Sequence, residues 1–371
     1  MRVLLSGGGT AGHIHPALTV AGHLAAEGHD VAFVGTSSGL EAQLVPAAGI
    51  PFHAVEARGF DRSRPLSLFS SAAIIGASTV RARALIRRYA PDVVVGFGGY
   101  VSLPVGFAAV TCAVPLVLHE QNSVPGLANR VLARWARAVA VTYEGSLDRF
   151  VRSRETVVTG NPVRDSVLTA DRERGRDRLG LRTGGVVLLV FGGSRGASHI
   201  NDTFVRIAPW LMQQPSLQVL HVAGRIETAS VADRIAATLG GDEPRYRVLG
   251  YIDEMGDALA ASDVVVARAG ATSIAEITAL GRPAVLIPYP FATDDHQTLN
   301  ARAVEVAGGA VVVLDSALDT EAVMEAIGRL VRDEGERRRM AAASAALGRP
   351  DAADRLVRLV LSFGNAREEP R

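Results

Sequence analysis

The sequence predicts two α/β domains, each built on a doubly wound parallel sheet with helices on both faces. Three observations support this. The 371-residue chain is longer than one hydrophobic core usually serves. Short apolar runs alternate with helical segments along both halves, which is typical of parallel sheets. The alternation pauses between residues 161 and 185 and then begins again, so the domain boundary is expected at residues 162–164.

Twelve short apolar runs are predicted to be strands, six in each half of the chain. In the first half they lie near residues 2–6, 30–34, 51–55, 92–96, 115–118 and 137–141, and in the second near 186–191, 217–222, 246–249, 263–267, 284–287 and 310–314. The predicted domains are therefore residues 1–163 and 164–371. The last helical segments, about 345–364, could pack on either domain, the first included.

One uncharged stretch, Gly96 to Leu118, is long enough to suggest a transmembrane helix. Pro104 and Pro115 divide it, which favours a buried helix near residues 102–111 followed by a strand. We therefore expect no membrane span in this stretch.

Composition excludes several other classes of protein. The formal net charge of +1 argues against a nucleic-acid partner, because no bulk attraction to phosphate backbones is available. Cys112 is the single cysteine, so no disulfide forms within the chain, and the N-terminal apolar run is too short for a signal peptide. The nine histidines show no metal-ligand spacing, so neither a metal nor another cofactor is expected.

A glycine turn, Gly7 to Gly12, joins the first predicted strand to a helix, where backbone N–H groups can approach an anion. It fits the dinucleotide fingerprint G-x-G-x-x-G. However, the acid expected on the ribose is missing, because the next strand ends in Gly35-Thr36. His13 places an imidazole where a bound anion would sit.

Two similar turns open helices in the second half. Residues 192–197 precede a helix near 198–213, and phosphate binding is favoured there over a plain turn capped by Ser198. Residues 268–276 follow another strand, and Glu276 can accept hydrogen bonds from ribose hydroxyls. A first-turn glutamate that complements the helix dipole remains an equal alternative.

Further polar clusters follow other predicted strands. Residues 98–102 and 119–122 end strands of the first domain, at the same rim as His13. Residues 288–301 include His296 and Gln297 and suit a hydroxyl-rich sugar, although an ordinary loop with a helix cap fits equally well.

These motifs together resemble the MurG family, glycosyltransferase family 28, which adds N-acetylglucosamine (GlcNAc) to the lipid-linked muramoyl-pentapeptide precursor of peptidoglycan. The resemblance rests on residues 8–13, 98–102, 119–122, 160–164, 192–197, 251–253 and 268–276, in order over most of the chain. It implies a GT-B architecture with two Rossmann-like domains facing across a cleft. It also implies an inverting transfer from UDP-GlcNAc to lipid I, forming lipid II, without an essential protein-bound metal.

The resemblance assigns site residues by motif position. His13 would be the catalytic base. The acceptor-binding residues would be Gly8, Gly9, Thr10, Ala11, Gly12, Tyr100, Glu120 and Asn122. The UDP-GlcNAc-binding residues would be Thr10, Ala11, Gly12, His13, Asn122, Arg164, Ser194, Ile252, Ala271, Thr272, Ser273, Glu276, His296 and Gln297.

A lipid acceptor implies a peripheral enzyme at the cytoplasmic face of the cell membrane. The stretch Leu66 to Ile75 is uncharged and is bracketed by arginines at 62, 64, 81 and 83, which suits an anionic inner-leaflet surface. A core helix with solvated ends is an equal alternative. The cell-wall synthesis and division machinery would be further partners.

Two other functions stay open. One is another UDP-sugar-dependent GT-B glycosyltransferase or a sugar-nucleotide epimerase, although an epimerase would use carboxylates where this chain has His13. The other is an NAD-dependent oxidoreductase built on Gly7 to Gly12, which the missing ribose acid and the second glycine turn disfavour.

Overall fold

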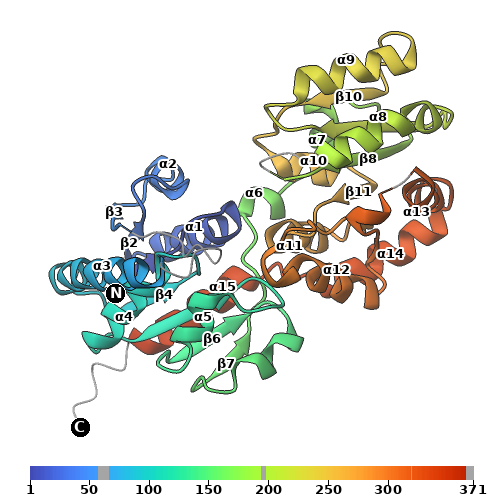
Figure 1. The fold of residues 1–371 in the computed structure, drawn as a ribbon. Helices are drawn as coiled ribbons and strands as arrows, with labels where there is room; N and C mark the ends of the chain where they lie inside the picture. The colour runs from blue at the N-terminus through green and yellow to red at the C-terminus, as the bar shows by residue number, and fades with distance from the viewer. Residues whose placement is uncertain (57–66, 194–197, 319, 365–371) are drawn as a thin grey trace. The chain divides into compact units, whose positions relative to one another are not determined.

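The structure is a computed structural model, which describes residues 1–56, 67–193, 198–318 and 320–364, with only the backbone of 67–73 and Thr320. It divides into two compact units between Val163 and Arg164 (Figure 1). The first unit also includes the chain from Pro350 onward, and the second ends at Arg349. The predicted fold class is confirmed, because both units are parallel α/β sheets flanked by helices.

The first unit contains a seven-stranded parallel sheet in the order β3-β2-β1-β4-β5-β6-β7. Its strands are β1 (Arg2–Ser6), β2 (Asp30–Gly35), β3 (Phe52–Ala54), β4 (Val93–Gly96), β5 (Leu116–Glu120), β6 (Ala138–Val141) and β7 (Thr156–Val158). Its helices are α1 (Ala11–Ala26), α2 (Glu41–Ala47), α3 (Ser67–Tyr89), α4 (Ser102–Thr111), α5 (Leu127–Leu132) and α15 (Ala352–Gly364), with a 3₁₀ segment η1 (Glu144–Phe150). The sequence prediction missed β7, because a half-buried strand of three residues is too short to show a periodic pattern.

The register of this sheet brings three turns to one edge. Ser6 pairs with Gly96, and Gly96 pairs with Leu118, so β1, β4 and β5 end side by side. Polar side chains that follow these strands therefore lie near one another. The uncharged stretch from Gly96 to Leu118 forms α4 and the start of β5, as predicted. None of the helices in the described part of the chain has the length and hydrophobicity of a membrane-spanning segment.

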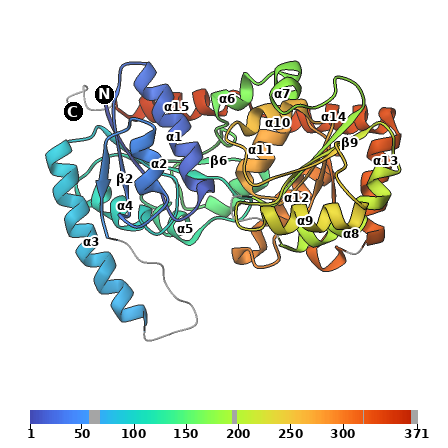
Figure 2. The ribbon, with the colours of Figure 1, turned by 90° about the horizontal axis from the view of Figure 1, so that it is seen from above.

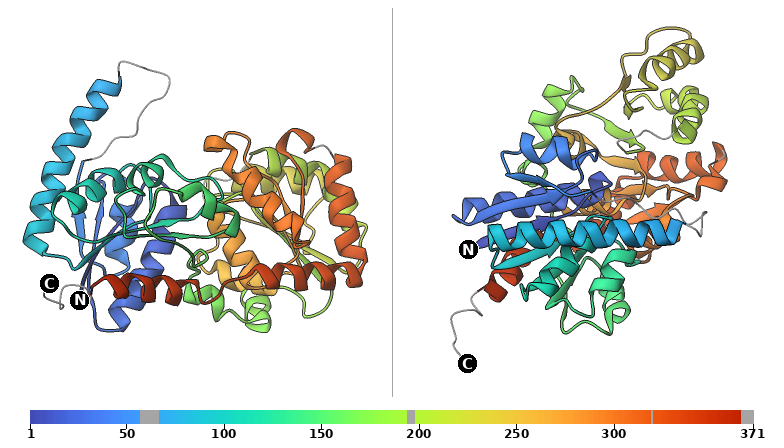
Figure 3. Two further views of the ribbon diagram at one scale, coloured as in Figure 1. Left: turned by 90° about the horizontal axis from the view of Figure 1, so that it is seen from below. Right: turned by 60° about the vertical axis from the view of Figure 1, so that its left-hand side comes forward.

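Two helices of the first unit, α15 and α3, differ in how much of their length packs on the rest of the unit. The helix α15 packs against α1 and covers a face of the first sheet (Figure 2). Leu356, Val357 and Val360 of α15 join the core formed by β1, β2 and β4. The C-terminal half of α3 packs on α4, whereas its N-terminal half projects beyond the sheet (Figure 3).

The second unit contains a six-stranded parallel sheet in the order β10-β9-β8-β11-β12-β13. Its strands are β8 (Val186–Phe191), β9 (Leu217–Val222), β10 (Tyr246–Leu249), β11 (Val264–Ala267), β12 (Ala284–Leu286) and β13 (Ala310–Val312). Its helices are α6 (Asp165–Leu168), α7 (Arg172–Arg178), α8 (Ser198–Met212), α9 (Thr228–Leu239), α10 (Met255–Ala261), α11 (Ala271–Ala279), α12 (His296–Val306), α13 (Thr320–Arg332) and α14 (Glu334–Leu347), with 3₁₀ segments η2 (Thr293–Asp295) and η3 (Asp315–Ala317).

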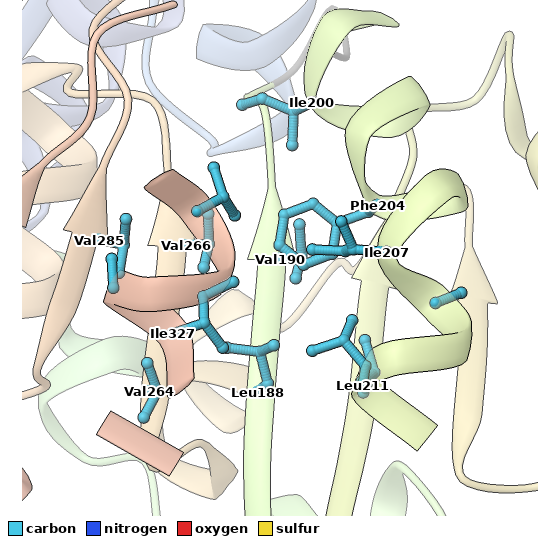
Figure 4. Packing of buried hydrophobic residues seen from close by; sticks show 14 of the residues in the cluster. Leu188, Val190, Ile200, Phe204, Ile207, Leu211, Val264, Val266, Val285 and Ile327 are labelled. Atoms are coloured by element: carbon cyan, nitrogen blue, oxygen red, sulfur yellow. The ribbon is translucent and has the colours of Figure 1, made fainter. Parts of the chain in front are cut away.

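The core of the second unit is built from strands that are apolar on both faces. All six residues of β8 are buried, as expected for a central parallel strand covered on both sides. Leu188 and Val190 pack against Phe204 and Ile207 of α8 (Figure 4). Because β8 and β11 pair in parallel, the turns that follow these two strands leave the sheet at the same edge.

Candidate functional site

The turn between β1 and α1 holds His13 in a defined orientation. The Nδ1 atom of His13 lies 2.9 Å from the carbonyl oxygen of Gly8 and 3.3 Å from Oγ1 of Thr10. A carbonyl oxygen can only accept a hydrogen bond, so Nδ1 carries the proton of the neutral ring. The neutral ring therefore has its basic lone pair on Nε2, as a general base requires.

The N-terminus of α1 is suited to an anion. Thr10 occupies the N-cap position, and no side chain of the described residues accepts a hydrogen bond as a cap there. The first turn of α1 contains no acidic residue. The N–H groups of Ala11 and Gly12 and the positive end of the helix dipole therefore point toward the turn.

A second glycine pair, Gly98-Gly99, packs against the first turn. Both residues have positive φ angles, 91° and 79°, which glycine adopts without strain. A Cβ atom at Gly99 would overlap the carbonyl of Gly8, and one at Gly98 would lie 3.2 Å from Nε2 of His13. Glycine is therefore required here by close backbone approach. Tyr100 follows with 57% of its surface exposed, beside a cavity of about 70 Å³ that Gly8 and Gly9 also line.

A buried polar network lies behind His13. His119 is fully buried, and its Nε2–H donates to the carbonyl of Gly160 at 3.0 Å. Its Nδ1 accepts from Nε2 of Gln121 at 3.1 Å, and the same amide donates to the carbonyl of Phe97 at 2.9 Å. Burial lowers the pKa of His119 to about 4, so the ring is neutral at pH 7 and serves as a structural link between strand ends.

Acid is expected to destabilise the first unit through His119. The folded pKa of about 4 lies below the ordinary value of 6.5, so the unfolded chain binds the extra proton first. Above pH 6.5 this ring therefore does not reduce the free energy of unfolding. As the pH drops to 4, preferential protonation of the ring in the unfolded chain lowers that free energy by about 3 kcal/mol. Urea unfolding of a Trp210→Phe protein, followed by the fluorescence of Trp135 in the first unit, measures this. In His119→Gln the pH-dependent loss should shrink by that amount, and an unchanged loss would contradict the assignment.

The carboxylate of Glu120 organises the loop that carries Asn122. Glu120 is 2% exposed, and its Oε1 accepts the backbone N–H of Asn122 at 3.0 Å. Its Oε2 accepts the N–H of Gly126 at 3.0 Å and Nδ2 of Asn129 at 2.8 Å. The predicted site residue Glu120 thus faces its own loop, and half-buried Asn122 is the residue that this loop presents.

Glu41 is a buried acid beside the glycine turn that the sequence analysis did not single out. Its buried carboxylate accepts hydrogen bonds from the N–H of Gly9 at 3.3 Å and from Thr36, through its N–H at 2.9 Å and its Oγ1 at 2.6 Å. Glu41 is the first residue of α2, six positions after the end of β2. The signal in the sequence was Gly35 and Gly39 on either side of the turn, since each leaves room for this side chain.

In the second unit, Arg164 and Glu276 form an ion pair. Nε and Nη2 of Arg164 lie 3.0 and 2.8 Å from Oε1 of Glu276. Burial raises the pKa of the Glu276 carboxyl, and the Arg164 guanidinium partly offsets that rise. Glu276 is 5% exposed and lies beyond the first turn of α11, so the alternative of a dipole-complementing first-turn glutamate is wrong.

The N-terminus of α11 is a second candidate anion site. Gly270 is the N-cap, and no side chain of the described residues caps the helix. The buried Oγ1 of Thr272 has no hydrogen-bond partner within the described part of the chain. A buried hydroxyl without a partner is costly unless a ligand or water satisfies it. Ala271 and Ser273 flank it on the same turn, whereas Ser194 lies outside the described residues.

Ile252 and the two candidates for sugar binding, His296 and Gln297, follow β10 and β12, strands that β9, β8 and β11 separate in the sheet. Ile252 is 9% exposed and follows β10. Gln297 accepts the N–H of Tyr289 at 3.0 Å, and Nδ1 of His296 donates to the carbonyl of Thr293 at 2.7 Å. Asp295 is the N-cap of α12 with a positive φ of 50°, but its side chain caps no backbone N–H among the described residues.

Arg268 anchors the start of the loop between β12 and α12. It is buried, donates to the carbonyl of Pro288 at 3.1 Å and pairs with Asp315 at 2.5 Å. Burial would raise the pKa of Asp315, but His199 and Arg268 together hold it below its usual value. The part of the chain that the structure describes contains no group of three or more His, Cys, Asp or Glu side chains placed to hold a metal ion.

Comparisons with known proteins identify one family over most of the chain. The model of the glycosyltransferase family 28 N-terminal domain matches residues 3–141, and that of the family 28 C-terminal domain matches residues 187–356. A Halothermothrix orenii protein is 40% identical over 366 residues, 97% of this chain and 98% of its own length. It is named UDP-N-acetylglucosamine–N-acetylmuramyl-(pentapeptide) pyrophosphoryl-undecaprenol N-acetylglucosamine transferase. A Desulforudis audaxviator protein of the same name is 40% identical over 97% of this chain and 98% of its own length.

Solved structures give the same picture. Acinetobacter baumannii MurG aligns with a TM-score of 0.79 and 29% identity, covering 97% of this chain and 99% of that one. The UDP-GlcNAc 2-epimerase of Neisseria meningitidis aligns with a TM-score of 0.68 and 14% identity, covering 98% and 100% of the two chains. At that identity the epimerase shares only the fold.

Proposed function

The chain belongs to glycosyltransferase family 28, and on this premise we propose that it transfers GlcNAc from UDP-GlcNAc to the C4 hydroxyl of the muramoyl sugar of lipid I, forming lipid II. The observation that carries the proposal is the hydrogen bond from Nδ1 of His13 to the Gly8 carbonyl, since it assigns the lone pair of the neutral ring to Nε2. A glycosyl acceptor needs such a base, positioned beside an anion site that can hold its pyrophosphate.

The acceptor binds to the first unit in this proposal. Its pyrophosphate is held by N–H groups of residues 8–12 at the uncapped N-terminus of α1. Exposed Tyr100 and half-buried Asn122 contact the acceptor sugar, and Glu120 acts through the loop that carries Asn122. His13 then removes the proton of the C4 hydroxyl as that oxygen attacks the anomeric carbon from the face opposite UDP, which inverts the configuration there.

The donor binds to the second unit. Glu276 accepts hydrogen bonds from the ribose hydroxyls, and the main chain of Ile252 contacts the uracil. The diphosphate is held by the N–H groups of Ala271, Thr272 and Ser273, by the hydroxyl of Thr272 and by Ser194. Arg164 lies within hydrogen-bond distance of Glu276 and adds positive charge near the nucleotide.

This arrangement stabilises the leaving group. As the glycosidic bond breaks, negative charge grows on the UDP phosphates, and the N-terminus of α11 and Arg164 are oriented to meet it before the reaction begins. His296 and Gln297, in the first turn of α12, bind hydroxyl groups of the sugar beside the loop that Arg268 anchors. The sugar is thereby held while its bond to UDP is exchanged for a bond to the acceptor.

The lipid tail of the acceptor implies a peripheral position at the cytoplasmic face of the membrane, and α3 is the candidate contact. Leu66 and the arginines at 62 and 64 lie outside the described residues, as do the side chains of Leu68 and Phe69. Ile74 and Ile75 are half-buried, and Arg87 and Arg88 are exposed near the end of α3. Basic side chains of this kind favour anionic lipids. Cell-wall synthesis and division proteins are proposed as further partners at that surface.

Anionic vesicles are expected to bind the protein more strongly than neutral ones. Flotation with phosphatidylglycerol-containing and pure phosphatidylcholine liposomes measures this, and Arg87→Glu/Arg88→Glu should lower recovery with the anionic vesicles about tenfold. The matched control is Arg338→Glu/Arg339→Glu on α14, which reverses two exposed charges in the second unit. Equal recovery with both kinds of vesicle would contradict the electrostatic contact.

Calorimetry with UDP, UDP-GlcNAc and NAD, together with an epimerisation assay, separates the remaining functions. We expect UDP and UDP-GlcNAc to bind and NAD not to bind. Tight binding of NAD without UDP would favour the oxidoreductase. Conversion of UDP-GlcNAc to its 2-epimer without any acceptor would favour an epimerase.

A further inference from the structure

Glu41 is a buried carboxylate that the proposed reaction does not use directly. Its exposed fraction is 0%, and it lies at the wall of the small cavity that Gly8, Gly9 and Tyr100 also line. It nevertheless ties together two turns of the first sheet. One is the turn after β2, through both hydrogen bonds from Thr36, and the other is the glycine turn after β1, through the N–H of Gly9.

Three glycines leave space for this carboxylate. A Cβ atom at Gly8 would lie 2.5 Å from Oε1 of Glu41, and Cβ atoms at Gly35 and Gly39 would lie closer still to the same side chain. At Gly39 the three nearest atoms would all belong to the carboxyl group of Glu41. The backbone is therefore shaped around the Glu41 carboxylate at three positions. A side chain that only filled a gap in the core would not require glycine at all three.

The contacts continue from Glu41 to His13. Glu41 holds Gly9 through its N–H and packs directly against Gly8. The carbonyl of Gly8 in turn accepts the Nδ1–H of His13 at 2.9 Å. The position of that carbonyl decides which ring nitrogen carries the proton, and hence whether the neutral ring has its lone pair on Nε2.

We propose that Glu41 is a positioning residue for the base, acting through the Gly8-Gly9 peptide to hold His13 in the Nδ1–H tautomer. This inference rests on the proposed function, in which Nε2 of His13 accepts the proton of the acceptor hydroxyl. Loss of the carboxylate lets the glycine turn relax, and the ring then samples the Nε2–H tautomer and other orientations. Chemistry slows, whereas the donor site in the second unit is unaffected.

The test combines steady-state kinetics with a steric double-mutant cycle. Glu41→Ala removes the carboxylate, and Gly39→Ala displaces it while keeping its charge. Each single variant should lower kcat by about 10- to 100-fold, the effect expected of a misplaced catalytic group, with the KM for UDP-GlcNAc within about twofold of wild type. In the double variant, Gly39→Ala should lower kcat no further than Glu41→Ala alone does, because the carboxylate that the added Cβ atom would meet is absent. Gly22→Ala on α1 is the matched control, because a Cβ atom added there would meet no described atom within 4 Å, and its kcat should equal that of wild type.

A spectroscopic readout separates positioning from general loss of structure. ¹⁵N spectra of histidine-labelled protein, with the His13 signals assigned by their loss in His13→Ala, report the tautomer. Wild type and Gly22→Ala should show Nδ1–H, and Glu41→Ala a mixture. Unchanged kcat in Glu41→Ala, additive losses in the cycle, or an intact Nδ1–H tautomer in a slow variant would overturn the inference. Absence of transfer by the wild-type protein would instead refute the proposed function, and the tautomer measurement would still test the link from Glu41 to His13.

Discussion

Replacing His13 with alanine should lower the kcat of GlcNAc transfer by about 10²- to 10⁴-fold, the range that general-base catalysis contributes. The reason is geometric, since the Gly8 carbonyl fixes the proton on Nδ1 and leaves Nε2 basic in the neutral ring. Alanine removes the base but adds no bulk to the turn. Steady-state rates at saturating UDP-GlcNAc and a lipid I analogue measure the loss.

Binding of UDP should distinguish His13 from a structural residue. Its Kd, measured by calorimetry, should stay within about twofold of wild type in His13→Ala, because the donor site lies in the second unit. His15→Ala, two residues further along the same helix, is the matched control and should keep its kcat. Turnover of His13→Ala close to the wild-type rate would rule out His13 as the base.

Replacing Glu276 with alanine should raise the KM for UDP-GlcNAc by about 100-fold. A hydrogen bond to a charged group contributes about 1.5–3 kcal/mol, and Glu276 is proposed to accept one from each of two ribose hydroxyls. Arg164 is also left without its carboxylate partner, but 29% of its side chain is exposed and water can solvate it. The expected defect is therefore in donor binding rather than in folding.

A modified donor makes this prediction more specific. Wild type should bind a 2′-deoxyribose analogue of UDP-GlcNAc about tenfold more weakly than UDP-GlcNAc itself, and Glu276→Ala should bind the two donors almost equally. Glu334→Gln, which alters an exposed glutamate paired with Arg338 on α14, is the control and should leave KM unchanged. Equal discrimination by wild type and Glu276→Ala would show that Glu276 does not contact the ribose.

The sequence was sufficient to predict the elements that position the site. Continuous apolar runs such as Val186–Phe191 identify buried parallel strands, and the glycine turns after β1 and β8 were evident from composition and spacing. The register then follows from the parallel pairing, which brings the ends of β1, β4 and β5 to one edge. Such runs predict strands well, because burial on both faces of the sheet favours an apolar side chain at every position of the strand.

The sequence did not predict which groups each of these side chains contacts. Arg164 and Glu276 are 112 positions apart, and no local pattern pairs them. Glu120 was expected to face the acceptor, but four N–H groups of its own loop and α5 surround its carboxylate. Glu41 was missed because no local pattern marks it as buried, and the space for its carboxylate is created by glycines at three separate positions.

The most direct test of this account is the transfer of radiolabelled GlcNAc from UDP-GlcNAc to a short-chain lipid I analogue, with analysis of the new glycosidic bond. The account predicts a labelled disaccharide-lipid carrying a β-linked GlcNAc, formed by wild type and nearly absent with His13→Ala. No labelled lipid from wild type, or a product with retained α configuration, would contradict it.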